Sequence, residues 1–298
     1  AHSALEAAEI IIGGERHHTL TNSFAGERIA WPSPFDALIE TLRSLSGRRV
    51  AVLATGDPLW YSVGARIGWA FSAGEIAYYP QLSAFQLAAC RMGWSLADVE
   101  TLTIHGRPPE QMIPFIAPGA RLLILTTGQE TPGIVARFLS ERGYGPSRLT
   151  VLANMDGPDE ARIEGTAEDW SETVPDFNTL AVEIVAGEAP RVLARTPGLP
   201  DTAFASDGTM TKREMRAVTL SRLMPMPGAL LWDIGCGSGS VAIEWMRAAR
   251  DARAIGVEPR ADRRALAAAN ASTLGTPGLT LVDGRAPECL PDLPAPDA

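Results

Sequence analysis

The chain has 298 residues, of which 46% are hydrophobic and 20% charged, so its composition is that of a globular protein long enough for two domains. Its net charge of −9, with no basic stripe to offset it, argues against a nucleic-acid partner. No apolar run reaches the roughly 18 residues that a membrane helix needs, so no membrane partner is expected.

Strands and helices alternate over residues 1–187, which predicts an α/β domain. The first residues lack the features of a signal peptide and read as a helix running into a strand, so we expect the chain to begin inside a domain. Further strands are predicted at 50–54, 75–79, 121–127, 149–153 and 179–185, and helices near 61–72, 83–93 and 132–142.

Residues 188–206 are rich in Pro, Gly and Ala without periodicity, which predicts a linker. The pattern of residues 207–298 then predicts a second domain, in which a helix at 211–223 leads into a βαβαβ unit. Its strands are expected at 229–234, 254–258 and 279–283, and its helices at 240–250 and 260–274. Because the unit stops after its third strand, we expect an incomplete Rossmann-like domain whose first strand is an open edge.

Three glycines at every second position, Gly235, Gly237 and Gly239, directly follow the first strand of this unit. A dinucleotide-binding fingerprint would place its third glycine at position 240, which is Ser240. The DxGxGxG form, led here by Asp233, is the methyltransferase version, in which the loop holds the amino-acid half of S-adenosylmethionine. A NAD-binding or purely structural turn is the alternative.

The rest of this predicted cofactor site follows from the spacing of the strands. Cys236 and Ser238 complete the glycine loop, and Glu258 ends the next strand, where a carboxylate can accept hydrogen bonds from ribose hydroxyls. Arg285 and Ala286 follow the third strand, where backbone would lie against adenine. All these strand ends fall on one edge of the sheet.

Two stretches of the second domain carry a family resemblance. Thr209-Met-Thr-Lys-Arg-Glu-Met-Arg216 and Ala286-Pro-Glu-Cys-Leu290 resemble the decarboxylating precorrin-6 C15-methyltransferases. The resemblance implies that Thr211 touches the cofactor. From the pattern alone, Thr211 with Glu214 also fits the capping box of an exposed helix start.

The first domain carries a second resemblance. The stretches Gly13-Gly-Glu-Arg-His-His18, Leu53-Ala-Thr-Gly-Asp-Pro-Leu-Trp-Tyr61, and 80–94 followed by His105-Gly-Arg107 resemble the tetrapyrrole methylases, in the precorrin C5-methyltransferase branch, over about residues 1–187. That family has a two-lobed α/β fold and an opening glycine-rich strand that is missing here. The resemblance places cofactor contacts on Thr55, Gly56, Asp57, Trp60, Ser83 and Ala84, with weaker candidates at Thr126 and Met155.

Taken together in this order, the two resemblances imply methylation of a corrin precursor at C5 and C15, with loss of carbon dioxide from the C12 acetate, in cobalamin biosynthesis. Each domain would use its own S-adenosylmethionine, and family members are commonly oligomeric, so a homo-oligomer is expected. Two alternatives remain open: one active methyltransferase site acting on another small molecule, and a tetrapyrrole or S-adenosylmethionine binding module without turnover.

Polar residues near these motifs are candidates for substrate binding and catalysis. The carboxylates of a corrin precursor would pair with arginines, for which Arg107, Arg213 and Arg216 are candidates. Lys212, the single lysine of the chain, and Glu244 are candidates for proton transfer. His17 and His18 are predicted to be structural or exposed, and the tryptophans at 60, 69 and 94 to line the core or a cleft.

The three cysteines, Cys90, Cys236 and Cys289, are far apart and form no CxxC or Cys/His cluster. Neither a metal site nor a disulfide framework is therefore predicted. This cysteine usage fits a reducing cytoplasm.

Overall fold

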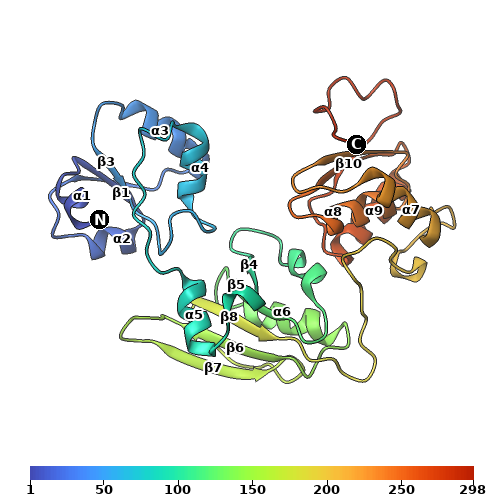
Figure 1. Ribbon diagram of the computed structural model, residues 1–298, viewed down its shortest axis with the longest axis horizontal. Helices are drawn as coiled ribbons and strands as arrows, with labels where there is room; N and C mark the ends of the chain where they lie inside the picture. The colour runs from blue at the N-terminus through green and yellow to red at the C-terminus, as the bar shows by residue number, and fades with distance from the viewer. The chain divides into compact units, whose positions relative to one another are not determined.

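The computed structural model describes residues 1–298, which fold as two compact units, Ala1–Cys90 and Arg91–Ala298 (Figure 1). The boundary predicted near residue 187 therefore lies inside the second unit. The strands form one sheet in the first unit and two in the second, and the fold is mixed α/β, as predicted. None of the helices combines the length and apolar character needed to cross a membrane.

The first unit is built on a parallel sheet with the strand order β2-β1-β3. The central strand carries Ile10, Ile11 and Ile12, which are fully buried because β1 has neighbours on both sides. The elements of this unit are α1 (His2–Glu6), β1 (Ile10–Gly13), α2 (Glu15–Leu20), β2 (Glu27–Ala30), η1 (Phe35–Ala37), α3 (Leu38–Ser44), β3 (Val50–Val52), α4 (Val63–Ala70) and α5 (Ala84–Met92).

The strand predicted at 75–79 does not form, and that prediction is wrong. Residues 72–75 instead close a turn, in which the Glu75 carboxylate accepts hydrogen bonds from the amide and the hydroxyl of Ser72. Tyr78 then donates its hydroxyl to the Gly64 carbonyl at 3.0 Å, which ties the segment to α4. Local side-chain hydrogen bonds thus replace the sheet ladder that the apolar run suggested.

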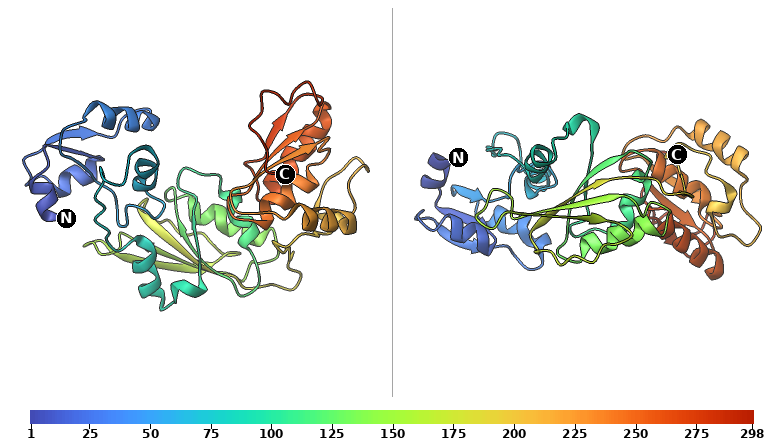
Figure 2. Two further views of the ribbon diagram at one scale, coloured as in Figure 1. Left: turned by 45° about the horizontal axis from the view of Figure 1, so that its top comes forward. Right: turned by 90° about the horizontal axis from the view of Figure 1, so that it is seen from below.

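The second unit opens with a five-stranded sheet in the order β4-β5-β8-β6-β7. Its strands are drawn in green and yellow in Figure 2. The pair β4–β5 is parallel and the other three pairs are antiparallel. The sequence did not predict β4 or β7. The elements here are η2 (Leu96–Asp98), β4 (Glu100–Thr103), η3 (Pro109–Phe115), β5 (Arg121–Leu125), α6 (Thr131–Ser140), β6 (Arg148–Ala153), β7 (Ala161–Thr166) and β8 (Asn178–Glu183).

The last third of the chain forms a parallel sheet in the order β11-β10-β9, half of a doubly wound fold. The sequence did not predict η4 (Asp201–Ala203). The other elements lie within a few residues of the predicted ranges: α7 (Arg213–Leu223), β9 (Leu230–Ile234), α8 (Ser240–Ala248), β10 (Arg253–Val257), α9 (Ala261–Thr273) and β11 (Thr280–Val282). Trp245 of α8 is 1% exposed and packs with Leu220 and Leu231, so α8 and α7 share one core with the sheet.

The expectation of an open edge at β9 is corrected by the structure. Residues 297 and 298 run alongside this strand, and the Trp232 amide donates to the Ala298 carbonyl at 3.0 Å. The Asp297 carboxylate also accepts a hydrogen bond from the Leu230 amide at 2.8 Å. These bonds satisfy backbone groups that an unpaired edge strand would leave exposed.

The segment predicted as a linker, 188–206, has almost no regular structure, yet much of it is packed in place. Leu199, Ala203 and Phe204 are at most 7% exposed and share a core cluster with Ile243 and Leu274. The segment is therefore packed against the last α/β layer and is not a flexible connection.

Gly143, which follows α6, is a glycine whose replacement should disturb the fold. An added Cβ would lie 2.5 Å from the Ala189 carbonyl oxygen, and φ is +79°. Gly119 has the same φ but nothing within 4 Å of that position. We expect Gly119→Ala to cost about 1–2 kcal/mol for the left-handed backbone alone. Gly143→Ala should cost roughly 1–3 kcal/mol more, because overpacking is added.

Urea unfolding of both variants measures the difference between their free energies of unfolding. Equal losses at the two positions would mean that the chain after residue 187 does not press on Gly143.

Candidate functional site

The glycine loop between β9 and α8 has the backbone that its sequence predicted. Gly235, Gly237 and Gly239 have φ values of +73°, +54° and +76°, a region that costs other residues about 1–2 kcal/mol. The Gly239 amide closes the loop on the Cys236 carbonyl at 2.8 Å, and Gly239 is the N-cap of α8. Residues 236–240 are buried and Gly235 is exposed, so a ligand can approach the loop backbone closely at Gly235, just before the N-terminus of α8.

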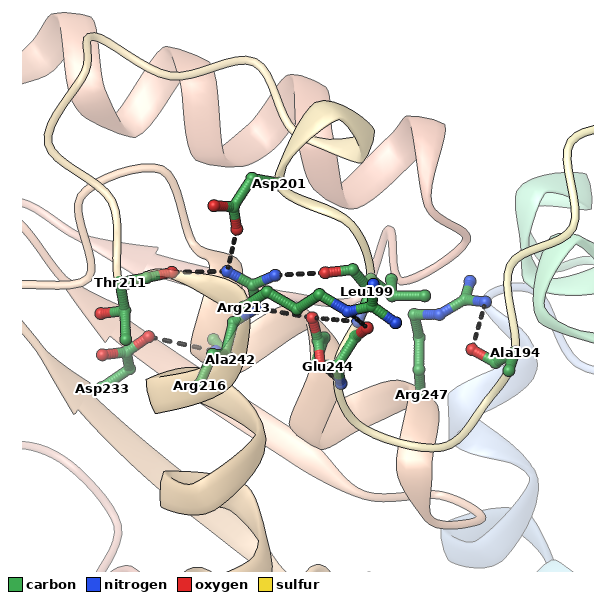
Figure 3. A network of polar contacts seen from close by, with 11 residues as sticks. Ala194, Leu199, Asp201, Thr211, Arg213, Arg216, Asp233, Ala242, Glu244 and Arg247 are labelled. Carbon is green, nitrogen blue, oxygen red and sulfur yellow. Dashed lines mark hydrogen bonds and ion pairs between the residues drawn. The ribbon is translucent and has the colours of Figure 1, made fainter.

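Asp233 is a partly buried carboxylate at the end of β9, beside this loop, and it forms no ion pair. One of its oxygens accepts a hydrogen bond from the Ala242 amide at 3.1 Å (Figure 3). Burial raises the pKa of Asp233 to about 6, and this single hydrogen bond only partly offsets the effect. A carboxylate in this position gains stability from any ligand that brings a positive charge, as the ammonium group of an amino-acid moiety does.

Glu258, at the end of β10, is 3% exposed and holds the loop from the other side. One carboxylate oxygen accepts from the Gly237 amide at 3.1 Å, and the other accepts from the Arg260 amide at 3.0 Å. Each carboxylate oxygen has two acceptor sites, so capacity remains for a pair of ligand hydroxyls. Asp233 and Glu258 therefore both lie next to the loop, and their contacts with S-adenosylmethionine stay predictions.

Cys236 and Ser238 contribute to the interior of the loop rather than to its surface. Both residues are at most 8% exposed, and the Cys236 sulfur lies where a Cβ at Gly256 would meet it at 2.7 Å. Burial, with the charges of Asp233 and Glu258, raises the pKa of the Cys236 thiol to about 12. The cysteine is therefore a protonated packing residue, whose backbone amide and carbonyl form hydrogen bonds with Val257 and Gly239.

The end of β11 lies beside the end of β10, since the Glu258 amide donates to the Val282 carbonyl at 3.1 Å. Arg285 and Ala286 are exposed just beyond this point, so their predicted contact with adenine stays a prediction.

A segment before α7 covers the glycine loop, and the residues that fasten it were missed by the sequence reasoning. Asn270 of α9 is 3% exposed and exchanges two hydrogen bonds of 2.8 Å with the backbone of Ala205. The same amide group donates to the Ser238 carbonyl at 2.9 Å. Arg263 of α9 pairs with Asp207 at 2.8 Å. A buried asparagine among the alanines of α9 was the signal that could have revealed this contact.

Arg216 is corrected from a substrate ligand to the centre of a buried network (Figure 3). Its guanidinium is fully buried and lies over the Phe204 ring at 4.8 Å. It donates to the Glu244 carboxylate at 2.6 Å and to Asp201 at 3.2 Å. It also donates to the carbonyls of Thr211 and Leu199. Each of its three nitrogens donates to the protein and the group is fully buried, so it does not reach a substrate carboxylate.

Glu244 is corrected in the same way. It is 1% exposed, and besides Arg216 it accepts hydrogen bonds from the Gly198 and Leu199 amides at 2.6 and 3.0 Å. A carboxylate held by three donors has neither access to a substrate proton nor a reason to take one.

The neighbouring candidates stay exposed. Lys212 is 65% exposed and lies 3.9 Å from Asp201, which is a weak ion pair. Arg213 is exposed and donates to the Gly198 carbonyl at 2.7 Å, and Thr211 is exposed at the end of the covering segment. Their roles remain predictions.

In the first unit, the structure brings together the predicted residues at the end of β3 and the start of α5. Gly56 has φ +70°, and a Cβ there would lie 2.9 Å from the Cα of Ser83, so the Thr55–Asp57 turn touches Ser83 directly. Asp57 accepts a hydrogen bond from the Leu59 amide at 2.7 Å. The ring centroids of Trp60 and Phe85, the residue after Ala84, lie 5.5 Å apart. Thr55 is exposed and is therefore available to a ligand.

Other predicted residues have varied surroundings. His105 lies 3.1 Å from the Thr126 carbonyl, and the buried Thr126 donates to the Asn178 carbonyl at 2.8 Å. Arg107 and Met155 keep their status as predictions.

Trp69 is 88% exposed, so its prediction as a core or cleft residue is wrong, whereas Trp94 packs under Arg121 at 5.2 Å. No group of three or more His, Cys, Asp or Glu side chains is placed to hold a metal ion.

Comparisons with known proteins agree with this division of motifs. Residues 1–171 match the family model of the tetrapyrrole (corrin/porphyrin) methylases, and residues 202–298 match that of a precorrin methyltransferase domain. A precorrin-6Y C(5,15)-methyltransferase [decarboxylating] from a Sinorhizobium species is 42% identical over 98% of this chain and 71% of its own length. A Mycobacterium tuberculosis protein of the same name is 34% identical over 99% of this chain and 74% of its own.

Among solved structures, the chain is similar to the C-terminal domain of precorrin-6Y C5,15-methyltransferase from Rhodobacter capsulatus. The identity is 51% and the TM-score 0.33, over 35% of this chain and 56% of that one. This chain thus spans little more than half of that solved domain.

Removal of the Glu244 carboxylate should destabilise the packing of the segment before α7 rather than stop proton transfer. Glu244→Ala leaves the Arg216 charge buried and two amides without an acceptor, so we expect a loss of about 3–5 kcal/mol in the free energy of unfolding. Glu214→Ala, on the exposed first turn of α7, is the matched control and should change it by less than about 0.5 kcal/mol. A Glu244→Ala protein of normal stability that lacks turnover would restore the catalytic assignment.

Ligand affinity at the glycine loop should depend on pH through Asp233. Its pKa of about 6 means that the carboxyl is mostly protonated at pH 5, and a cationic group of the ligand then has to displace that proton. We expect S-adenosylhomocysteine to bind roughly tenfold more weakly at pH 5 than at pH 8. Calorimetric titration measures the affinity, and Asp233→Asn should remove this dependence. A dependence that survives the substitution would belong to another group.

Proposed function

Because the chain belongs to the family of precorrin-6Y C5,15-methyltransferases (decarboxylating), we propose that it methylates a corrin precursor at C5 and C15 and promotes loss of carbon dioxide from the C12 acetate. It is an S-adenosylmethionine-dependent enzyme of cobalamin biosynthesis, with a tetrapyrrole as substrate. The observation that carries the proposal at the second site is a pair of carboxylates, the partly buried Asp233 and the buried Glu258, next to three glycines with left-handed backbone.

We further propose that each of two domains holds its own S-adenosylmethionine. The domain of residues 1–187 would methylate C5 and the domain of residues 207–298 would methylate C15 and decarboxylate. The contact of the Thr55–Asp57 turn with Ser83 supports a ligand site in the first, and the glycine loop supports one in the second. Self-association into a homo-oligomer also remains part of the proposal.

The donor sets of the chain fit this cofactor. When bound, the cofactor supplies an activated methyl group on a sulfonium, so the protein has little covalent work to do. At the second site, Asp233 would neutralise the ammonium group, Glu258 would accept from the ribose hydroxyls, and the loop backbone would leave room for close approach. Holding a ring carbon in line with the methyl group in a dry pocket can supply several kcal/mol.

Proton transfer in the second site has few candidates among the residues near the loop. Glu244 is committed to Arg216, so Lys212, exposed next to Thr211, remains the proposed acid or base. Loss of carbon dioxide returns the electron pair of the broken bond to the ring, as loss of a proton would. A strong base is therefore not required for methylation at C15.

Mass spectrometry of the product separates the two sites. With labelled S-adenosylmethionine and precorrin-6B, the full-length protein should add two methyl groups and remove one carbon dioxide. We expect Asp57→Ala to lower C5 methylation by tenfold or more while sparing decarboxylation, and Asp233→Ala to do the reverse, because each carboxylate serves one site.

The alternatives give different results. Loss of both activities in either single variant would favour one shared site, and binding without any methyl transfer would indicate a module that only binds. Binding of one S-adenosylhomocysteine per chain, rather than two, would contradict the proposed stoichiometry.

A further inference from the structure

His17, which the sequence suggested to be structural or exposed, contacts a predicted cofactor residue of the first unit. Its Nε2 lies 3.0 Å from the hydroxyl oxygen of Thr55, 38 residues further along the chain. Both residues follow the carboxyl ends of neighbouring strands, because β1 and β3 are paired in parallel. This edge of a parallel sheet is where ligands bind in α/β folds.

The other ring nitrogen of His17 determines which atom carries the proton. His17 is at the third position of α2, and its Nδ1 accepts a hydrogen bond from the amide of Gly14, the N-cap residue, at 3.2 Å. This is the place that Glu or Gln takes in a capping box. A backbone amide only donates, so Nδ1 is unprotonated and Nε2 carries the proton of the neutral ring.

The surroundings of His17 favour the neutral ring. Burial lowers the pKa of His17, and the neighbouring charges of Arg16 and His18 lower it further. The Trp31 ring meets the imidazole edge to face at 6.5 Å, and the missing side chain of Gly14 makes room for Trp31. Protonation at Nδ1 would also break the hydrogen bond from Gly14.

The direction of the hydrogen bond to Thr55 follows from this tautomer. Nε2–H donates, so the Thr55 hydroxyl oxygen accepts, and the hydroxyl proton points elsewhere. Thr55 makes no other side-chain hydrogen bond, and its side chain is exposed beside the turn that touches Ser83. The hydroxyl is thus held as an outward donor.

We propose that His17 is a positioning residue of the first methyl-transfer site, which orients the Thr55 hydroxyl so that it donates to a carboxylate oxygen of a bound ligand. This inference rests on the proposed C5-methyltransferase function. The carboxylate belongs either to the methionine part of the cofactor or to a side chain of the tetrapyrrole, and kinetic constants distinguish the two.

Two substitutions separate this role from a structural one. In His17→Asn the amide oxygen replaces Nδ1, so the cap on Gly14 is kept but Thr55 is out of reach. Thr55→Val removes the hydroxyl with little change in shape. We expect each variant to unfold at nearly the wild-type temperature and to lose roughly three- to tenfold in kcat/KM for C5 methylation, the effect of one hydrogen bond.

The double variant His17→Asn/Thr55→Val should be no worse than Thr55→Val alone, because His17 acts through Thr55. His18→Asn, on the same helix but bonded to the Ile29 carbonyl, is the matched control and should leave the constants unchanged. A rise confined to the KM of S-adenosylmethionine would place the carboxylate on the cofactor, and a rise confined to the KM of the tetrapyrrole would place it on the substrate.

Nitrogen NMR of the protein labelled at its four histidines tests the tautomer without turnover. The expected spectrum has an unprotonated Nδ1 and a protonated Nε2 for His17, assigned as the signal lost in His17→Asn. The reverse tautomer, or additive losses in the double variant, would overturn the inference. Absence of C5 product from the wild-type protein would instead refute the proposed function itself.

Discussion

The Arg216 guanidinium is the constraint around which the last third of the chain is arranged. A charge removed from water must be fully paired, and here the partners come from four separate places: Glu244 on α8, Asp201, and the carbonyls of Leu199 and Thr211 (Figure 3). Because three of these partners lie in the chain before α7, the pairing fixes the path of that whole segment. Thr211 is held at its end, close to the glycine loop.

The two candidate sites use different means to make a ligand surface from the same kind of sheet edge. At β9 and β10 the surface consists of left-handed glycines with one buried and one partly buried carboxylate, so charge and close backbone approach carry recognition. At β1 and β3 it consists of a turn held by Ser83 and a hydroxyl held by His17, so hydrogen-bond direction carries it. Glycine at positions 56 and 237 is required in both because the backbone turns left-handed there.

The strands and motifs of the second domain could be predicted because their signals are local. Alternating glycines after an apolar run, and an acid at the end of the next strand, depend only on neighbours in the sequence. The buried roles of Arg216, Glu244 and Asn270 could not, since each depends on partners 15 to 65 residues away. The error at 75–79 has a different cause, because a turn between Ser72 and Glu75 and a hydrogen bond from Tyr78 to Gly64 replace the sheet ladder.

Cys236 places a thiol inside a loop proposed to bind an alkylating cofactor. The environment of the thiol determines whether the cofactor can methylate it. Thiols attack sulfonium methyl groups only as thiolates. With the pKa raised to about 12, only about one Cys236 in 100,000 is ionised at pH 7, and the sulfur is turned toward Gly256 in the sheet. Burial of the thiol, helped by the acidic pair that would hold the cofactor, thereby also protects the enzyme from methylating itself.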